Sequence, residues 1–331
     1  MKIIVDSMGS DKGPKEIVQG VVDGVNELGV DAIIVGRENI ISKELSKYNY
    51  PKDSIEIINA EESINNEDEP VLAIRRKKNS SMVLALEALA SGQGDGLVST
   101  GSTGALLAGG LFIVKRIEGV ERPALATVYP TKKGISFILD VGANVDSKPE
   151  YLLQFATMGS IYGEKVLGTK SPTIALANIG VEEGKGNALT KDAYKLLSNS
   201  DLNFVGNVEV RDIPEGVVDI IVCDGFVGNV ILKLTEGMAM SMFSTLKEEF
   251  TSSFKSKIGA LMLKSQLKSF KDRLDYREYG GAPLLGLRKP VVKAHGSSDA
   301  FAIKNALRQV KTFSDNNVIN IIEENIKGAF L

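Results

Sequence analysis

The chain alternates short apolar runs with longer segments in which apolar residues recur at helical spacing. The runs of strand length cover residues 3–5, 32–35, 55–58, 97–99, 124–128, 135–139, 173–177, 204–205 and 220–222. Strands joined by helices pair in parallel and are buried on both faces, so this pattern predicts a three-layer α/β/α sandwich around a mainly parallel sheet. Ligands of such sheets bind at the carboxyl ends of the strands, where we expect the functional residues.

One strand end, within residues 95–108, breaks from an apolar run into small and hydroxylated residues before a helical pattern resumes. Gly101 and Gly104 permit close backbone approach, and Ser102 and Thr103 add hydroxyls beside the unpaired N–H groups of a helix start. Such a turn suits an anion. An ordinary capped turn of an α/β protein has the same composition, so both interpretations stay open for this stretch alone.

Other strand ends are polar as well. The first strand ends at Asp6, and Pro14 predicts a helix that continues to about Leu28. Similar Gly, Asp and Asn residues follow later strands, at residues 140–144, 178–186 and 223–229. Because the ends of parallel strands meet at one edge of a sheet, the combination favours a binding site.

The composition excludes several classes of protein. The 331 residues are 43% hydrophobic and 24% charged, with a net charge of −3, which fits a globular chain and opposes nucleic-acid binding through a broad basic face. With Cys223 as the only cysteine and His295 as the only histidine, we expect neither an intramolecular disulfide nor a His/Cys metal cluster. The chain starts directly as a strand and lacks a run of about 18 apolar residues, so we expect a cytoplasmic protein.

A run of four cations ends a predicted helix at Arg75, Arg76, Lys77 and Lys78. One interpretation is a solvated last turn that complements the helix dipole, and the other is a local basic patch with a function.

Residues 236–275 lack the strand pattern and form a long helical segment with a local excess of positive charge. An apolar tip at Leu261, Met262 and Leu263 interrupts its basic helices. The segment therefore packs on the core or on a partner subunit, or it contacts a membrane surface.

The residues available for chemistry do not include an evident nucleophile. Cys223 lies at the end of an apolar strand, where a cysteine is usually a small buried hydrophobic residue. The chain also lacks a second histidine that could form a Cys/His or Ser/His pair. Hydroxyls, backbone N–H groups, lysines and amides suit anion binding and oxyanion stabilisation. Three functions fit: group transfer to or from phosphate, a dinucleotide-dependent dehydrogenase, and a noncatalytic sensor of a phosphorylated metabolite. The dehydrogenase is weakened because G-x-G-x-x-G does not follow the first strand.

Ordered motifs occur along the whole chain. They are DSMGSDKGP, AIRRKKNSSM, GSTGALLAGG, LDVGANVDSKPEYLLQFATMGSIY, NIGVEEGKG, FVGNVEVRDI, CDGFVGNVILKLTEG and GGAPLLGLRKPVVKAHGSSDA. Together these motifs resemble those of the PlsX family of phosphate acyltransferases. The resemblance implies one domain over residues 1–331, similar in fold to isocitrate and isopropylmalate dehydrogenases and to phosphotransacetylases, with a protruding helical hairpin at residues 236–275.

The resemblance also implies an activity. Inorganic phosphate would attack the thioester of acyl-acyl carrier protein (acyl-ACP), giving acyl phosphate and free ACP for phosphatidic acid synthesis, without an acyl-enzyme, a metal or a redox cofactor. The alternatives are a phosphotransacetylase-like transfer between acyl-CoA and phosphate, or an NAD-dependent decarboxylating dehydrogenase.

Site roles follow from the same resemblance. Lys185 would offset the phosphate charge, Asn229 would position phosphate or the oxyanion, and His295 would donate to the leaving thiolate, while Asp224 would orient Lys185. The residues expected to bind substrate or phosphate are Gly101, Ser102, Thr103, Gly104, Asp6, Asn144, Gly225, Gly228 and Ser297. This chain departs from the family pattern at Ser102, where Asn is usual, and at residues 7–10, where Ala-Met-Gly-Gly is usual.

The resemblance further implies partners. The acidic ACP would dock on Arg75, Arg76, Lys77, Lys78 and Arg122, and the tip residues Leu261, Met262 and Leu263 would contact the inner face of the cell membrane. A membrane glycerol-3-phosphate acyltransferase would consume the product. We also expect a homodimer in which the helical segment takes part, and no nucleic-acid partner.

Overall fold

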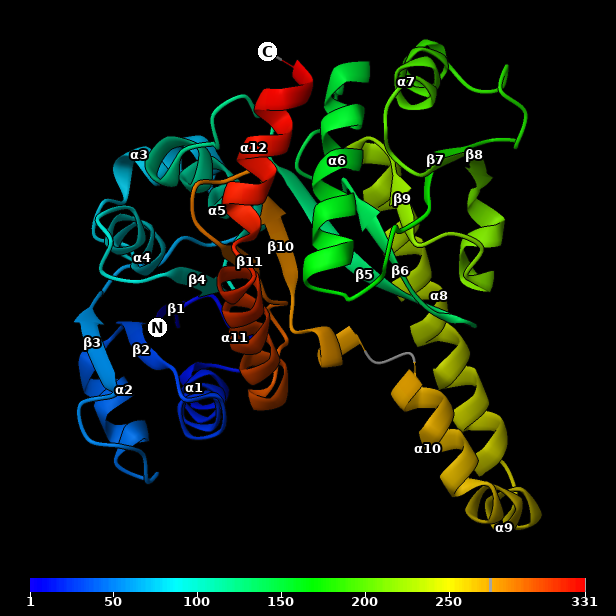
Figure 1. Ribbon diagram of the computed structural model, residues 1–331. Coiled ribbons are helices and arrows are strands. Elements are labelled where there is room, and N and C mark those ends of the chain that lie inside the picture. The colour runs from blue at the N-terminus through cyan, green and yellow to red at the C-terminus, as the bar shows by residue number, and fades with distance from the viewer. Residues whose placement is uncertain (274–275, 331) are drawn as a thin grey trace.

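A computed structural model describes residues 1–273 and 276–330, and the sheet dominates it (Figure 1). This part of the chain forms an 11-stranded sheet in the order β3-β2-β1-β4-β11-β10-β5-β6-β9-β7-β8. The strands are β1 (Lys2–Asp6), β2 (Asp31–Gly36), β3 (Ile55–Asn59), β4 (Gly96–Ser99), β5 (Ala124–Thr131), β6 (Gly134–Leu139), β7 (Ile174–Asn178), β8 (Phe204–Glu209), β9 (Ile220–Val222), β10 (Ala282–Leu285) and β11 (Val291–Lys293). Each apolar run predicted as a strand overlaps one of them.

Helices connect most of the strands. They are α1 (Pro14–Leu28), α2 (Glu38–Leu45), α3 (Pro70–Arg76), α4 (Ser81–Ala90), α5 (Thr103–Gly109), α6 (Pro149–Lys165), α7 (Ala188–Ser198), α8 (Gly225–Thr251), α9 (Phe254–Met262), α10 (Lys264–Arg273), α11 (Ala300–Asp315) and α12 (Val318–Phe330). A π-helical turn, η1 (Gly110–Val114), continues α5, and 3₁₀ turns occupy η2 (Val210–Glu215) and η3 (Tyr276–Tyr279). The predicted helix from Pro14 to Leu28 is confirmed.

The sheet contains two parallel blocks that run in opposite directions. Strands β1 to β4 and β11 are parallel to one another, as are β6 to β9. Between the blocks, β10 is antiparallel to both β11 and β5, and β5 is antiparallel to β6. The expectation that all strand ends share one edge is therefore wrong, because the β5–β6 hairpin reverses the direction of the chain.

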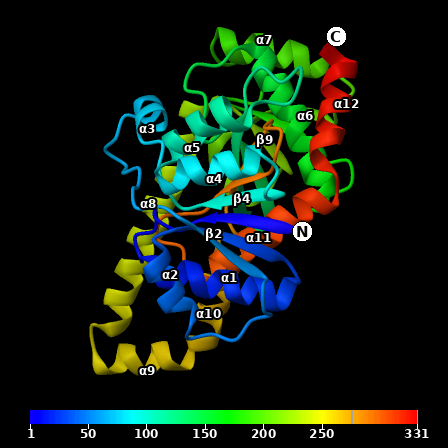
Figure 2. The ribbon, with the colours of Figure 1, turned by 90° about the vertical axis from the view of Figure 1, so that its left-hand side faces the viewer.

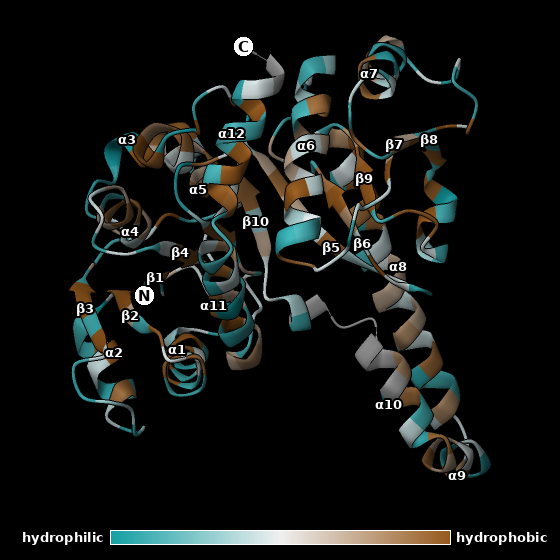
Figure 3. Cartoon of the chain, viewed as in Figure 1, coloured by the Kyte–Doolittle hydropathy of each residue, from teal (hydrophilic) through white to brown (hydrophobic). Residues whose placement is uncertain are grey.

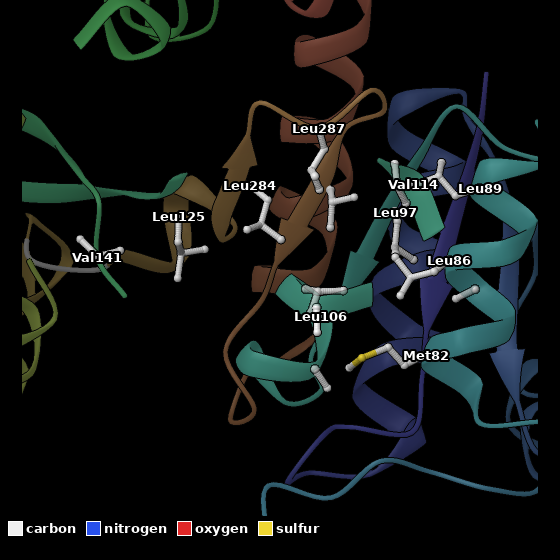
Figure 4. Packing of buried hydrophobic residues seen from close by; sticks show 14 of the residues in the cluster. Met82, Leu86, Leu89, Leu97, Leu106, Val114, Leu125, Val141, Leu284 and Leu287 are labelled. Carbon is white, nitrogen blue, oxygen red and sulfur yellow. The ribbon is translucent and has the colours of Figure 1, made fainter. Parts of the chain in front are cut away.

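Helices cover both faces of the sheet. Figure 2 shows the first block nearly edge-on, with α3, α4 and α5 on one side and α1 and α2 on the other. On the first of these faces, Met82, Leu86, Leu97 and Leu106 pack together (Figure 4). The same hydrophobic cluster continues into the second block through Val141 and neighbouring residues, so the two blocks share a core.

The helices α8, α9 and α10 extend away from the body as an arm (Figure 1). Helix α8 begins at Gly225, directly after β9, so the helical segment starts before residue 236, and residues 274–275 of the predicted hairpin lie outside the described residues. Figure 3 marks hydrophobic residues along this arm in brown. Several of them, including Met240 and Leu261, are exposed. Of the helices that the structure describes, none combines the length and the apolar character needed to span a bilayer.

Candidate active site

Three neighbouring strands of the first block end in polar residues that pair side by side across the sheet. Ser99 pairs with Asp6 of β1 and with Lys293 of β11. Since Ile4, Leu97 and Val291 belong to the core beneath α4 and α5, alternation places Asp6, Ser99 and Lys293 on that same face. The Ser99 hydroxyl donates to Asp6 Oδ2 at 2.8 Å, and the N–H of Gly101 donates to Ser99 Oγ at 3.1 Å. This row therefore ties the 99–101 turn to β1.

The predicted anion-binding turn follows this row. Gly101 and Ser102 are buried, whereas Thr103 and Gly104 are exposed. A Cβ at Gly9 would lie 2.2 Å from Gly101 Cα, so the loop after β1 touches the turn backbone to backbone. Position 9 therefore requires glycine, because a side chain there would collide with the turn. The Ser102 side chain makes no cap hydrogen bond within α5.

His295 follows β11 and is held by Ser297. Its Nδ1 accepts a 3.1 Å hydrogen bond from the Ser297 N–H and lies 2.7 Å from Ser297 Oγ. Burial, with Lys293 and Lys233 nearby, lowers the pKa of His295 below its usual value, against the opposing effect of Glu236 and Asp11. The ring is therefore neutral at pH 7, and the hydrogen bond to Nδ1 selects the tautomer with the proton on Nε2.

Lys293 is a site residue that sequence reasoning missed. Its Nζ donates to the carbonyl oxygens of Thr100 at 3.2 Å and Ala294 at 2.5 Å. Burial lowers its pKa to about 8, although Asp6 and Asp11 raise it. A lysine between the apolar residues of VVKA was the available signal, because strands rarely bury a cation without a reason.

Asp140 organises the strand end of β6. Its Oδ1 accepts from the N–H groups of Leu125, Gly142 and Ala143, and its Oδ2 from both nitrogens of Asn144, over 2.6–3.2 Å. Burial raises the pKa of this carboxyl, and these hydrogen bonds oppose that effect. The carboxylate therefore fixes the 140–144 loop, and Asn144 Nδ2 additionally bonds the Pro123 carbonyl.

The start of α8 packs directly on this loop. The Gly225 N–H donates to the Asn144 carbonyl at 2.8 Å, and a Cβ at Gly228 would lie 1.9 Å from the Asp140 carbonyl oxygen. Only glycine fits at such a contact. Gly142 lies against the side chain of Asn229, which is exposed. The structure thus brings Asn144, Gly225, Gly228 and Asn229 together.

Asp224 differs from its expected role. Its Oδ1 accepts from the Val227 N–H at 2.9 Å and caps α8. Lys185 is exposed, its N–H donates to the Glu182 carbonyl, and its own carbonyl accepts from Asn178 Nδ2. Across the residues described, Asp224 and Lys185 form no ion pair, because the carboxylate faces the helix start.

Helix α8 connects the two groups of residues. Lys233 pairs with Glu236 at 2.8 Å, and both act electrostatically on His295, while Lys233 also acts on Lys293. One turn earlier, the same helix presents Asn229 between the exposed side chains of Phe226 and Val230. Lys233 of α8 thus lies near the cationic end of β11, and Asn229 lies one turn before Lys233 on the same helix.

The predicted docking residues lie apart from these groups. Lys77 pairs with Asp68 at 2.6 Å, and the guanidinium of Arg75 stacks over Phe112. Arg76 and Lys78 are exposed at the end of α3, and Arg122 lies over the ring of Tyr151. At the tip of the arm, the exposed fractions of Leu261, Met262 and Leu263 are 70%, 78% and 46%.

Solved structures share this fold. A phosphotransacetylase from Streptococcus pyogenes superposes with a TM-score of 0.62 at 19% identity, over 96% of this chain and 94% of that one. A 4-hydroxythreonine-4-phosphate dehydrogenase from Klebsiella pneumoniae gives a TM-score of 0.50 at 14% identity, over 94% and 99%. The fold is therefore that of the phosphotransacylases and related dehydrogenases, and the predicted fold class is confirmed.

The sequence comparison is more specific. The model of a family described as "Fatty acid synthesis protein" matches residues 1–321. A phosphate acyltransferase from Alkaliphilus oremlandii is 55% identical over 328 residues, covering 99% of this chain and 98% of the relative. The chain belongs to this family of phosphate acyltransferases, as its motifs predicted, and it is an acyltransferase enzyme.

Proposed function

We propose that this enzyme converts acyl-ACP and inorganic phosphate into acyl phosphate and free ACP. The observation that carries the proposal is the placement of Lys293 and His295 beside the 99–104 turn and near Lys233 of α8, the helix that also carries Asn229. Cationic groups, backbone N–H groups and a side-chain amide together suit a phosphate nucleophile and a developing oxyanion.

In the proposed reaction, a phosphate oxygen attacks the thioester carbonyl carbon and the C–O bond forms. The tetrahedral intermediate then expels the phosphopantetheine thiolate as the C–S bond breaks. The Nε2–H of His295 donates to the leaving sulfur, and Asn229 with the 101–104 backbone positions phosphate or the oxyanion. The acyl group passes from sulfur to oxygen without a change in oxidation state, so the proposal includes no redox cofactor.

Lys185 belongs to the proposal as a residue of a separate glycine-flanked loop. Its exposed side chain would reach the phosphate when substrate is bound, and Gly186, at φ 94°, gives this loop a conformation that favours glycine. Asp6, Ser102, Thr103, Gly104 and Ser297 complete the proposed phosphate surroundings from the first block.

The decisive experiment measures phosphate-dependent release of ACP thiol from acyl-ACP. We expect Lys185→Ala and Asn229→Ala to lower turnover strongly and to change its phosphate dependence. Wild-type turnover with unchanged phosphate dependence in both variants would refute these roles. Parallel assays with acyl-CoA and with NAD separate the alternatives, since a phosphotransacetylase prefers the first and a dehydrogenase reduces the second.

The proposed ACP surface includes Arg76 and Lys78, which are exposed at the end of α3. Because attraction between exposed charges is screened by salt, the KM for acyl-ACP should rise with ionic strength. The double variant Arg76→Glu, Lys78→Glu should raise this KM and leave the phosphate KM unchanged. Lys43→Glu, on the exposed side of α2, is the matched control, and equal KM values in both variants would oppose this docking surface.

We also propose peripheral attachment to the inner face of the cell membrane. The exposed apolar tip of α9 lies among Lys255, Lys257 and Lys264, a combination that favours anionic bilayers. A membrane glycerol-3-phosphate acyltransferase would receive the product there. Vesicle cosedimentation tests the attachment, because Leu261→Glu with Leu263→Glu should release the protein and equal binding would refute the role of the tip.

A homodimer formed through the arm is the remaining part of the proposal. Support comes from the exposed apolar side chains of α8, which include Leu234, Met238, Met240 and Met242. Sedimentation velocity should give the mass of two chains, and Met238→Lys with Met242→Lys should shift it to one. A monomeric wild type would refute the dimer.

A further inference from the structure

Lys293 belongs to the proposed site, but the proposed reaction gives its side chain no particular role. The side chain lies at the carboxyl end of β11, in register with Ser99 of β4, and is partly buried. Its ammonium group donates to two backbone carbonyls, those of Thr100 and Ala294. An ammonium has three N–H donors, so one remains after these two bonds.

The charges around Lys293 do not include a directly bonded carboxylate among the described residues. Asp6 on β1 and Asp11 on the following loop act on it from a distance, and Lys233 on α8 opposes them. His295 lies two residues along the chain and is likewise affected by Lys293 and Lys233. A cation without a directly bonded carboxylate, such as Lys293, favours an anionic ligand.

Thr100 links this cation to the anion-binding turn. Its carbonyl oxygen accepts a hydrogen bond from Lys293. The residue before it is Ser99, whose hydroxyl donates to Asp6, and the residue after it is Gly101, whose N–H donates to the Ser99 hydroxyl. The bond from Lys293 keeps the Thr100 carbonyl dipole directed at the ammonium. Without it, a carbonyl oxygen would be free to turn toward the ligand and repel an anion.

We propose that Lys293 is a positioning residue for inorganic phosphate, which fixes the 99–101 turn through the Thr100 carbonyl and supplies positive charge at the phosphate position. This inference rests on the proposed function and adds a residue to its site. It also explains why Lys293, His295 and Lys233 gather at one place although they come from separate elements.

The role has a consequence for pH dependence. Because the pKa of Lys293 is lowered to about 8, the ammonium loses its proton within the alkaline range where an ordinary lysine stays charged. Phosphate binding should therefore weaken as the pH rises through about 8. The charged groups that act on Lys293 are Asp6, Asp11 and Lys233.

Direct phosphate binding is tested without turnover. Inorganic phosphate should raise the Tm of the wild-type protein relative to chloride at equal ionic strength. Lys293→Met, of similar length but uncharged, should lose most of this rise. The control Lys289→Met changes a lysine just before the opposite end of β11 and should keep it. If Lys293→Met kept the full rise, the inference would be overturned.

Kinetics provide the second readout. Lys293→Met should raise the phosphate KM by about tenfold or more, the usual effect of losing a charged hydrogen-bonding group, and leave the KM for acyl-ACP unchanged. Lys293→Arg should restore a phosphate KM close to wild type at pH 7 and remove its rise above about pH 8. A purely structural lysine would not move this profile, so identical pH profiles for wild type and Lys293→Arg would overturn the inference.

Different results would refute the proposed function and the role of Lys293. If the wild type released no thiol from acyl-ACP, the proposed function would fall, while the phosphate-induced Tm shift would still test Lys293. If Lys293→Met did not fold, the pH profile of Lys293→Arg would decide. Normal thiol release with a phosphate KM that Lys293→Met changes by less than about twofold would refute the inference alone.

Discussion

The hydroxyl of Ser99 donates a 2.8 Å hydrogen bond to Oδ2 of Asp6, and both residues are buried where β4 and β1 end side by side. The same hydroxyl oxygen accepts from the Gly101 N–H. One serine therefore connects the carboxylate of one strand to the turn that follows the next. The proposed site depends on this link, because the described residues show no other side-chain hydrogen bond between the turn and β1.

Ser99→Ala should destabilise the protein by about 1–3 kcal/mol, since it leaves a buried carboxylate oxygen and a buried N–H without their partner. Urea unfolding measures the change. Ser244→Ala, on the exposed surface of α8, is the control and should change stability by less than about 0.5 kcal/mol. Equal stability of the two variants would show that the buried link contributes nothing.

Gly228→Ala should damage both stability and turnover. The added Cβ would lie 1.9 Å from the Asp140 carbonyl, so α8 must shift away from the 140–144 loop, at a cost of about 1–3 kcal/mol or more. Gly237→Ala, in the same helix, meets no atom within 4 Å and should stabilise the protein by up to about 1 kcal/mol. Thermal unfolding of both variants tests whether the two substitutions change the stability in opposite directions.

His295 predicts a specific pH dependence of stability. Its folded pKa is lowered, so between that value and the unfolded value near 6.5 the unfolded chain binds more protons, and stability falls as the pH drops through this window. Above about pH 6.5 the contribution is fully present. The His295→Gln variant lacks this pH-dependent contribution to stability. The difference in the free energy of unfolding between wild type and variant should therefore shrink on acidification. Urea unfolding from about pH 8 to about pH 5.5 measures this, and a constant difference would contradict the lowered pKa.

Thr100→Val should not lower the Tm. Thr100 Oγ1 is buried and has no hydrogen-bond partner, so its replacement by a methyl group removes an unsatisfied polar atom. Ser136 offers the contrast, because its buried hydroxyl donates to the Val218 carbonyl at 2.7 Å. Ser136→Ala should lower the Tm by several degrees, and a larger loss in Thr100→Val would refute the unpartnered state of that hydroxyl.

Local patterns predicted much of the architecture. The apolar runs that ended at Asp6 and Ser99 and the helix that began at Pro14 all appear in the structure. Strand β10 was missed, because its four residues include Pro283 and lie between glycines, a composition typical of loops. It pairs on both sides only because tertiary contacts supply its neighbours.

The sequence also predicted polar residues at the strand ends, but it did not show which contacts they make. Asp140 and Asp224 look alike in sequence, each an aspartate before a glycine-containing turn. In the structure the first binds five N–H donors of its surroundings and the second caps α8. Lys293 carried only a weak signal, since its significance comes from Thr100, Asp6 and Lys233, which are distant in sequence.

By itself the sequence determined the family and most of the strand and helix pattern, because these depend on local composition and ordered motifs. Only the tertiary structure decided that the β5–β6 hairpin divides the sheet into opposed blocks, and that α8 brings Lys233 from one block near Lys293 and His295 of the other. Pairing between distant strands and the charges that burial perturbs arise from contacts across the whole chain, and no local pattern encodes them.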